Sequence, residues 1–267
     1  MKGQMEILCV GNELLIGKVL NTNAQWLAGY ATKLGIAVRQ ITVVTDDVKE
    51  IARALLDVLA RKPNFVITTG GLGPTFDDIT LKGIAEALKR KLEINDEALK
   101  MVKERYYHHI TERKVDRTKL TPSNIKMAKL PQGAEPLNNP VGTAPGMKIR
   151  VNGTLLAALP GVPSEMEAIF EESLAPLLKK ESGEEAFFEK SIYLQGIMES
   201  ALAPVIDQVM HDNKPVYIKS HPKGLGKGVE VHFSITSRDE KEATEILRKA
   251  VTQLSELAVA SGGQIEA

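Results

Sequence analysis

The chain has 267 residues, of which 43% are hydrophobic and 25% are charged; this length and composition suit a large domain, or an ordinary domain with a smaller one, and exclude disordered and collagen-like classes. Its 34 Lys and Arg residues balance its 34 Asp and Glu residues, and only 4% of residues are aromatic, so we expect no nucleic-acid partner. No stretch approaches about 18 consecutive apolar residues and no signal-peptide core is recognisable, so we expect a cytoplasmic protein with no membrane partner.

The chain begins with an apolar run followed by a helical pattern. Residues 5–10 are a continuous apolar run ending at Gly11, which is typical of a buried parallel strand. Cys9 lies in this run and is expected to pack in the core; as the only cysteine, it excludes an intrachain disulfide and a cysteine-based zinc site. A helical stripe follows over residues 22–34, with Asn21 or Thr22 as its cap.

The same alternation continues through the next segments. Residues 36–44 are a second predicted strand, after which Asp47, three residues before Glu50, opens a helix. Residues 65–69 are a third buried strand, which leads through a glycine-rich loop into a helix predicted over about 78–91. This order predicts an α/β domain whose parallel sheet is covered by helices on both faces.

A further helix is predicted over about 96–111, and His108 and His109 lie near its end. These histidines have two possible roles, as metal ligands or as solvated helix surface. Neighbouring residues on a helix point about 100° apart, which makes it difficult for them to share a metal ion. We therefore favour the surface role.

A hairpin and a helix complete the first predicted domain. Residues 147–158 suit two strands joined by Asn152-Gly153, a dipeptide that tolerates positive φ in a tight turn. Ser164 and Glu167 suggest a capping box for a helix ending near Lys180. The polar residues that follow are typical of a linker, so we predict domains at 1–180 and 186–267.

The second domain is predicted to be a small α+β unit of βαββα order, similar to a KH-like module. Its strands are expected near 190–194, 216–219 and 229–237, and its helices over 199–210 and 240–260. The Lys- and Gly-rich segment 223–228 has two interpretations, a phosphate contact or a hairpin turn. We favour the turn.

The glycine-rich loop after the third strand carries the clearest chemical signal. Gly70, Gly71 and Gly73 let backbone N–H groups approach a phosphate without a Cβ in the way, and the next helix N-terminus adds a favourable dipole. Open α/β sheets bind ligands at the carboxyl ends of their strands. The loop therefore predicts a phosphate-bearing ligand.

Two carboxylates, Asp77 and Asp78, follow this loop directly. They would repel a phosphate unless a cation lay between, which predicts a divalent metal ion. The alternative is that Asp78 only caps its helix, with Thr80 as a weaker cap. Asp46 follows the second strand and is a further candidate metal ligand, whereas the neighbouring Asp47 is expected to cap a helix.

Other loops at the same predicted edge could complete the site. Glu13, Asn21 and Asn23 lie between the first strand and the next helix. The segments 139–146 and 159–163 are rich in Gly and Pro, which fixes rigid loops that suit either ligand contacts or structural connections. Because 159–163 precedes a helix N-terminus, we expect it to border the phosphate site.

Four segments, 11–15, 70–80, 139–146 and 159–166, together resemble the competence/damage-inducible CinA family, and the resemblance spans nearly the whole chain. The first domain is similar to the MoaB/MogA molybdopterin-binding fold, with Leu72 in place of the threonine of its GGTG loop. The resemblance implies a metal-dependent ADP-ribose pyrophosphatase, a KH-like second domain and a homodimer.

Two departures from the family pattern qualify these expectations. Relatives commonly continue into a nicotinamide mononucleotide deamidase domain, whereas this chain stops at Ala267, the pattern of an archaeal-type short form, so we expect no deamidase activity. Asn12 stands where many relatives carry an acidic residue, so a metal role is not carried over to it.

The leading hypothesis is thus metal-dependent hydrolysis of a nucleotide-sugar pyrophosphate such as ADP-ribose, with Asp78, Asp77 and Asp46 as catalytic and metal-binding residues. A non-catalytic molybdopterin- or nucleotide-binding module is the alternative. The expected substrate contacts are Glu13, Asn23, Gly70, Gly71, Gly73, Pro74, Thr75, Thr80, Asn139, Gly142, Thr143, Pro160, Gly161 and Pro163.

Overall fold

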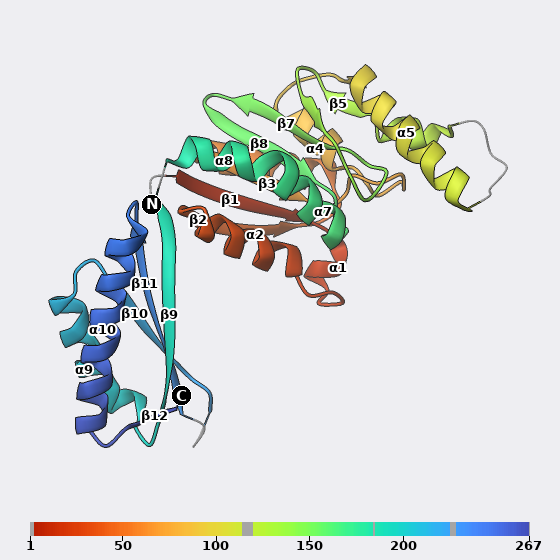
Figure 1. The fold of residues 1–267 in the computed structure, drawn as a ribbon. Coiled ribbons are helices and arrows are strands. Elements are labelled where there is room, and N and C mark those ends of the chain that lie inside the picture. The colour runs from red at the N-terminus through yellow and green to blue at the C-terminus, as the bar shows by residue number, and fades with distance from the viewer. Residues whose placement is uncertain (1–2, 114–119, 184, 225–227, 267) are drawn as a thin grey trace. The chain divides into compact units, whose positions relative to one another are not determined.

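A computed structural model describes residues 3–113, 120–183, 185–224 and 228–266, without the side chains of 108–113. The chain divides into two compact units, Met1–Gly183 and Glu184–Ala267 (Figure 1). The expectation for His108 and His109 concerns side chains outside the described set. No helix of the described segments is both long and apolar enough to cross a membrane.

The first unit is built on a mixed sheet with the strand order β2-β1-β3-β8-β7-β6. The first four strands in this order run parallel to one another, and the last two are antiparallel additions at one side. The α/β fold class with a predominantly parallel sheet is therefore confirmed. The strands are β1 (Gly3–Val10), β2 (Ile36–Val44), β3 (Phe65–Thr69), β6 (Glu135–Leu137), β7 (Gly146–Val151) and β8 (Thr154–Leu159).

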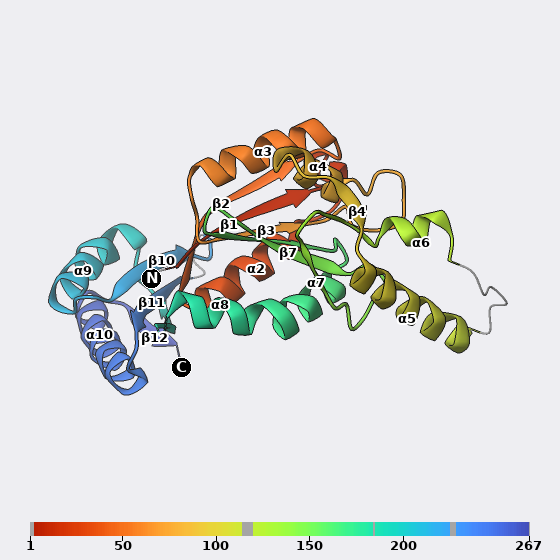
Figure 2. The same cartoon turned by 90° about the horizontal axis from the view of Figure 1, so that it is seen from above.

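Helices cover both faces of this sheet (Figure 2). One face carries α3 (Val48–Ala60) and α4 (Thr80–Ala87). The other carries α2 (Thr22–Lys33), α7 (Pro163–Ile169) and α8 (Ala175–Ser182), the last two joined by a π-helical turn over Phe170–Leu174. The other elements of this unit are α1 (Asn12–Leu15), β4 (Leu92–Ile94), α5 (Asp96–Arg113), α6 (Pro122–Lys126) and β5 (Lys129–Pro131).

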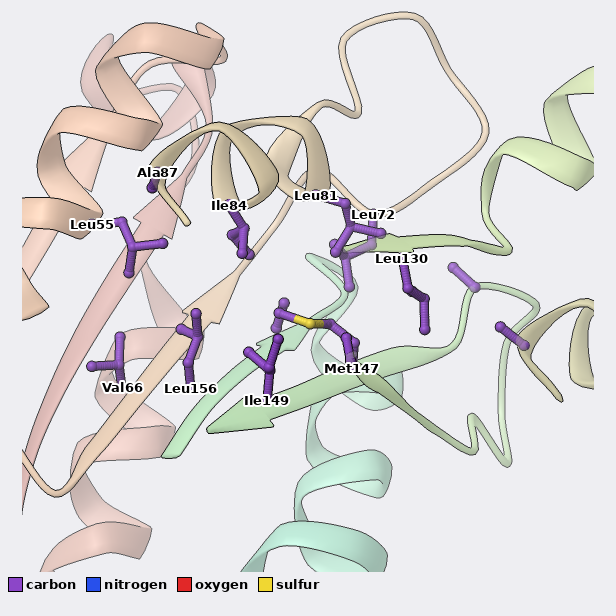
Figure 3. Packing of buried hydrophobic residues seen from close by; sticks show 14 of the residues in the cluster. Leu55, Val66, Leu72, Leu81, Ile84, Ala87, Leu130, Met147, Ile149 and Leu156 are labelled. Atoms are coloured by element: carbon purple, nitrogen blue, oxygen red, sulfur yellow. The ribbon is translucent and has the colours of Figure 1, made fainter. Parts of the chain in front are cut away.

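Each face of the sheet has its own hydrophobic core. Between the sheet and α3 and α4, residues such as Leu55, Ile84 and Leu156 pack together (Figure 3). On the opposite face, the buried Phe170 meets Trp26 and Tyr30 edge-on, with ring centroids 5.5 and 5.2 Å away. Cys9 is buried in this second core, as predicted, and its burial raises the pKa of its thiol.

The structure confirms the predicted caps of two helices and the predicted turn of the hairpin. Asn21 accepts a hydrogen bond from the Ala24 N–H at the start of α2, and Asp47 accepts from the N–H groups of Lys49 and Glu50 at the start of α3. The β7–β8 hairpin turns at Asn152-Gly153, whose φ angles are 49° and 92°. Local side-chain chemistry therefore sets these boundaries.

The predicted capping box at Ser164 and Glu167 is wrong. Helix α7 begins at Pro163, its N-cap residue is Val162, and no side chain caps it. Proline favours the first helical position because it lacks the N–H that would be unpaired there and its φ is already helical. Pro163 therefore starts the helix two residues too early for Ser164 to act as its cap.

Removal of a glycine from a helix offers a test of the local structure. Gly29 lies exposed within α2, and nothing comes within 4 Å of a Cβ added there. Because alanine has the higher helix propensity, Gly29→Ala should raise the free energy of unfolding by about 0.5–1 kcal/mol. Urea denaturation followed by circular dichroism would measure it; a loss of stability would contradict this placement of α2.

The second unit has one four-stranded antiparallel sheet with the order β10-β11-β9-β12. Its hydrophobic core draws on this sheet and both of its helices. The βαββα order agrees with the sequence pattern, and β12 is an addition that the pattern did not predict. The elements are β9 (Ala186–Gln195), α9 (Glu199–Asp212), β10 (Tyr217–Pro222), β11 (Val229–Ser237), α10 (Glu240–Ala260) and β12 (Gln264–Glu266).

The lysine- and glycine-rich connection lies between β10 and β11, which pair as antiparallel neighbours. At its ends, the Lys223 N–H donates a hydrogen bond of 3.1 Å to the Gly228 carbonyl. Residues 225–227 of the predicted turn lie outside the described residues.

Candidate functional site

A cavity of about 630 Å³ lies where β1, β3 and β8 end. Loops that follow these three strands and the loop after β2 all contribute to its walls. This is the edge of the sheet where open α/β folds bind ligands. The structure thus gathers segments that are far apart in the sequence.

Most of the residues proposed from the sequence line this cavity. Three do not: Thr80 and Asn139 are buried, and Gly142 is a buried residue of the segment 139–146. The residues that line it are Glu13, Asn23, Asp46, Gly70, Gly71, Gly73, Pro74, Thr75, Asp77, Asp78, Thr143, Pro160, Gly161 and Pro163.

The glycine loop is fixed at its first residues by close backbone packing. Gly70 has φ of +103°, and a Cβ there would lie 2.2 Å from the Val10 carbonyl oxygen. The buried Thr80 hydroxyl donates a 2.7 Å hydrogen bond to the Gly70 carbonyl, which makes Thr80 a support of the loop. A Cβ at Gly71 would lie 2.3 Å from the Thr80 hydroxyl oxygen, so only glycine fits.

The next part of the loop offers hydrogen-bond donors to a ligand. Within the described residues, the backbone N–H groups of Gly71, Leu72 and Gly73 have no hydrogen-bond acceptor. Gly71 and Gly73 line the cavity together with Leu72. Successive unpaired N–H groups are a suitable environment for an anion such as phosphate.

The helix-capping alternative for Asp78 is wrong. Helix α4 begins at Thr80, its N-cap residue is Ile79, and no side chain caps it. The Asp78 carboxylate instead accepts hydrogen bonds from the Thr75 N–H at 2.8 Å and the Thr75 hydroxyl at 2.6 Å. Because Asp78 turns back to the glycine loop, the helix starts later than the sequence pattern suggested.

Asp77 and Asp78 converge on one hydroxyl group. The Thr75 hydroxyl is within hydrogen-bonding reach of a carboxylate oxygen of each, yet it has one proton to donate. The Thr75 hydroxyl and the backbone N–H of Asp77 lower the pKa of the Asp77 carboxyl, with a smaller contribution from Lys126. Asp77 and Asp78 therefore place two neighbouring carboxylates at the loop, both at least partly exposed to solvent.

Asp46 and Asn12 join the loops after β2 and β1. The Asn12 N–H donates to the Asp46 carboxylate at 2.8 Å, and the Asp46 N–H donates to the Asn12 side-chain oxygen at 3.4 Å. Only Oδ2 of Asp46 takes part in these hydrogen bonds. One carboxylate oxygen of Asp46 therefore remains for a ligand, water or cation.

Asn23 joins three segments of the cavity wall. Its side-chain amide donates to the Thr69 hydroxyl at 3.0 Å and to the Gly161 carbonyl at 2.9 Å. The Thr69 hydroxyl donates in turn to the Pro160 carbonyl at 2.9 Å. A Cβ at Gly161 would lie 3.3 Å from Gly70 Cα, so the segment 159–163 lies beside the glycine loop.

Glu165 also lines the cavity, although it is not among the site residues predicted from the sequence. Glu165 lies in the first turn of α7, and its carboxylate accepts a 2.7 Å hydrogen bond from the Asn139 side-chain amide. The Asn139 side-chain oxygen also accepts from the Gly142 N–H at 2.7 Å. Asn139 therefore shapes the wall and orients Glu165. In the sequence, the position of Glu165 at the start of a helix just after a Gly/Pro-rich loop could have identified it as a site residue.

The cavity is strongly acidic. Its described lining contains the carboxylates of Glu13, Asp46, Asp77, Asp78 and Glu165 but no Lys, Arg or His. The described residues contain no group of three His, Cys, Asp or Glu side chains able to hold a metal ion without further ligands. Asp77 and Asp78 still suit Mg²⁺, which commonly takes one or two carboxylates and completes its coordination with phosphate oxygens and water.

Comparison with known proteins places these features in a family. Residues 6–180 match the family model described as a probable molybdopterin binding domain. A protein of Pyrobaculum arsenaticum is 46% identical over 260 residues, covering 96% of this chain and 95% of the relative. A protein of Aeropyrum pernix is 46% identical over 266 residues, covering 97% and 95%.

Among solved structures, the protein CinA of Thermoplasma acidophilum, described as of unknown function, is 40% identical with a TM-score of 0.58. The similarity covers 67% of this chain and 98% of that one.

Proposed function

The chain belongs to the CinA-type proteins with a molybdopterin-binding-like domain, and we propose that its first unit binds and hydrolyses a nucleotide-sugar pyrophosphate such as ADP-ribose. The observation that supports this most directly is that one cavity contains both backbone N–H groups without acceptors and neighbouring carboxylates. Such a cavity suits a ligand that carries phosphate and arrives with a cation.

Binding depends on the glycine loop. The N–H groups of Gly71, Leu72 and Gly73 would donate to phosphate oxygens, and the absent Cβ atoms at the two glycines let the phosphate approach the backbone. Asn23 and Thr69 hold the loop at 159–163 against Gly70, which fixes the opposite wall. The site is therefore formed before the ligand arrives.

The carboxylates have a separate role. Asp77 and Asp78 would hold a divalent ion, which when bound would activate water and neutralise phosphate charge. Asp46, fixed by Asn12, keeps one carboxylate oxygen to hydrogen-bond a water or a ligand hydroxyl. Glu165, fixed by Asn139, brings another carboxylate to the lining and limits where an anionic group can lie.

A second candidate is a binding module for molybdopterin or a nucleotide that carries out no reaction. It is favoured by the match of residues 6–180 to the probable molybdopterin binding domain. The same glycine loop would hold the pterin phosphate. The two candidates differ in whether a pyrophosphate bond is cleaved.

Hydrolysis of ADP-ribose tests the proposal directly. Water would add to one phosphorus while the bridging P–O bond breaks, so AMP and ribose 5-phosphate should form in equal amounts. We expect this reaction with Mg²⁺ or Mn²⁺ and its loss with EDTA, measured by chromatography of the nucleotides. AMP alone should remain intact. Tight binding of molybdopterin without any cleavage of ADP-ribose would instead support the non-catalytic module.

A further inference from the structure

A second, smaller cleft of about 200 Å³ adjoins the main cavity. The two share Gly71, Leu72, Gly73 and Asp78, so the glycine loop borders both. The rest of the small cleft comes from α4, β4, α6 and β5. These contributions are Leu81 and Lys82 from α4, Leu92 from β4, Lys126 from α6 and Lys129 from β5.

The charge of this cleft is opposite to that of the main cavity. Lys82, Lys126 and Lys129 line it, against the single carboxylate of Asp78. In the described part of the chain, none of these three lysines forms an ion pair within 4 Å. One carboxylate does not balance three ammonium groups, so the lining of this small concave space carries an excess of positive charge.

Lys126 is the most constrained of the three. Its ammonium group donates to the carbonyl oxygens of Gly73, at 3.4 Å, and of Thr75. Partial burial lowers the pKa of Lys126 and the charge of Lys82 lowers it further, whereas Asp78 and Asp77 raise it. Lys82 and Lys126 line the same small cleft, so their positive charges repel each other, and an anion between them would relieve this repulsion.

The cleft has a firm base. Leu72 and Leu81 are buried and point into the core between the sheet and α4 (Figure 3). These two side chains fix the glycine loop and the start of α4 at one wall, while Lys82 and Lys129 remain exposed. An anion could thus reach the cleft without rearrangement of the core.

We propose that the cleft lined by Lys82, Lys126 and Lys129 is an anion subsite that accepts a phosphate group. The lysines supply positive charge that the lining of the main cavity lacks, and the shared loop places the two sites side by side. The phosphate comes either from a nucleotide whose remainder occupies the main cavity or from free phosphate. The inference goes beyond the proposed hydrolysis, because it requires binding only.

Removal of two lysines tests the subsite. The double variant Lys82→Gln/Lys129→Gln leaves Lys126 and its contacts with the loop in place. Because a hydrogen bond to a charged group contributes about 1.5–3 kcal/mol, affinity for inorganic phosphate should fall by at least about tenfold. Isothermal titration calorimetry with inorganic phosphate, and separately with AMP, would measure the dissociation constants.

A matched control removes the same charge elsewhere. Lys33→Gln/Lys180→Gln replaces exposed lysines near the ends of α2 and α8 and should change phosphate affinity by less than about twofold, because neither residue lines the cleft and exposed charges are screened by salt. Equal affinities in the two double variants, with unchanged circular dichroism, would overturn the subsite. A parallel loss for AMP assigns the phosphate to the nucleotide; a loss for inorganic phosphate alone assigns it to the free anion.

The outcome for the subsite can be separated from that for hydrolysis. If the wild-type chain never cleaves ADP-ribose but loses phosphate affinity in Lys82→Gln/Lys129→Gln, the subsite stands and the proposed hydrolase does not. If cleavage occurs and neither phosphate nor AMP affinity changes in this variant, the hydrolase stands and the subsite does not.

Discussion

Replacement of Asp78 with asparagine should lower ADP-ribose hydrolysis by roughly 10² or more, the cost typical of losing one electrostatic element of a catalytic site. One Asp78 oxygen accepts from both the N–H and the hydroxyl of Thr75, and an asparagine oxygen can accept the same two hydrogen bonds. The negative charge beside Asp77 disappears while the loop keeps its geometry. Initial rates with saturating Mg²⁺ would measure the effect, and the melting temperature should stay nearly constant.

Two further variants locate the effect of Asp78. Asp207→Asn removes one exposed carboxylate from α9 in the second unit and should leave the rate unchanged. Asp77→Asn tests the neighbouring carboxylate, whose loss should also lower the rate if the pair holds the cation. A variant Asp78→Asn with turnover within a few-fold of wild type would show that Asp78 serves only to hold Thr75, leaving Asp77 and Asp46 as the candidate ligands.

Much of the fold could be predicted because its signals are local. The run at 65–69 begins with three apolar residues, and it forms the buried strand β3 with these same bounds. Asp47 caps α3 through its own side chain, and Asn152-Gly153 turns the β7–β8 hairpin at positive φ. In each case, residues close together in the sequence determine the local structure.

The errors occurred where two local arrangements compete for the same residues. Asp78 has the sequence position of a helix cap, but its carboxylate hydrogen-bonds to Thr75 and α4 begins at Thr80. Ser164 and Glu167 have capping-box spacing, but Pro163 already starts the helix. Spacing alone does not show which of two competing local arrangements the surrounding chain stabilises.

Part of the candidate site could be predicted from the sequence and part could not. The glycine loop was recognisable because three closely spaced glycines let backbone N–H groups approach a phosphate, and in the structure Gly70 and Gly71 adopt positive φ. The lysines of the small cleft carry no such signal, since Lys82, Lys126 and Lys129 come from separate elements that only the folded chain brings together. A single lysine in a sequence usually indicates only an exposed surface residue. Three lysines around one cleft indicate a possible anion site.

The largest loss of stability among the glycine substitutions considered is expected for Gly70→Ala, about 3 kcal/mol in the free energy of unfolding. Its φ of +103° lies outside the regions that alanine prefers, which costs about 1–3 kcal/mol. The new Cβ would also lie 2.2 Å from the carbonyl oxygen of Val10, a backbone atom that cannot swing away. Relief of this clash would separate the ends of β1 and β3 and disturb the hydrogen bond from the Gly70 N–H to the Leu159 carbonyl.

Gly17→Ala separates the two causes. Gly17 has φ of +69°, and nothing lies within 4 Å of a Cβ added there, so its substitution introduces backbone strain without a clash. Lys62 and Lys89 already adopt φ of 54° and 52°, so this region is accessible to ordinary residues here. We expect Gly17→Ala to cost about 1 kcal/mol and Gly70→Ala about 2 kcal/mol more, measured by urea denaturation of both variants. Equal losses would mean that the approach of Gly70 to Val10 is not tight, and the glycine loop would then owe its position to Thr80 and the 159–163 segment instead.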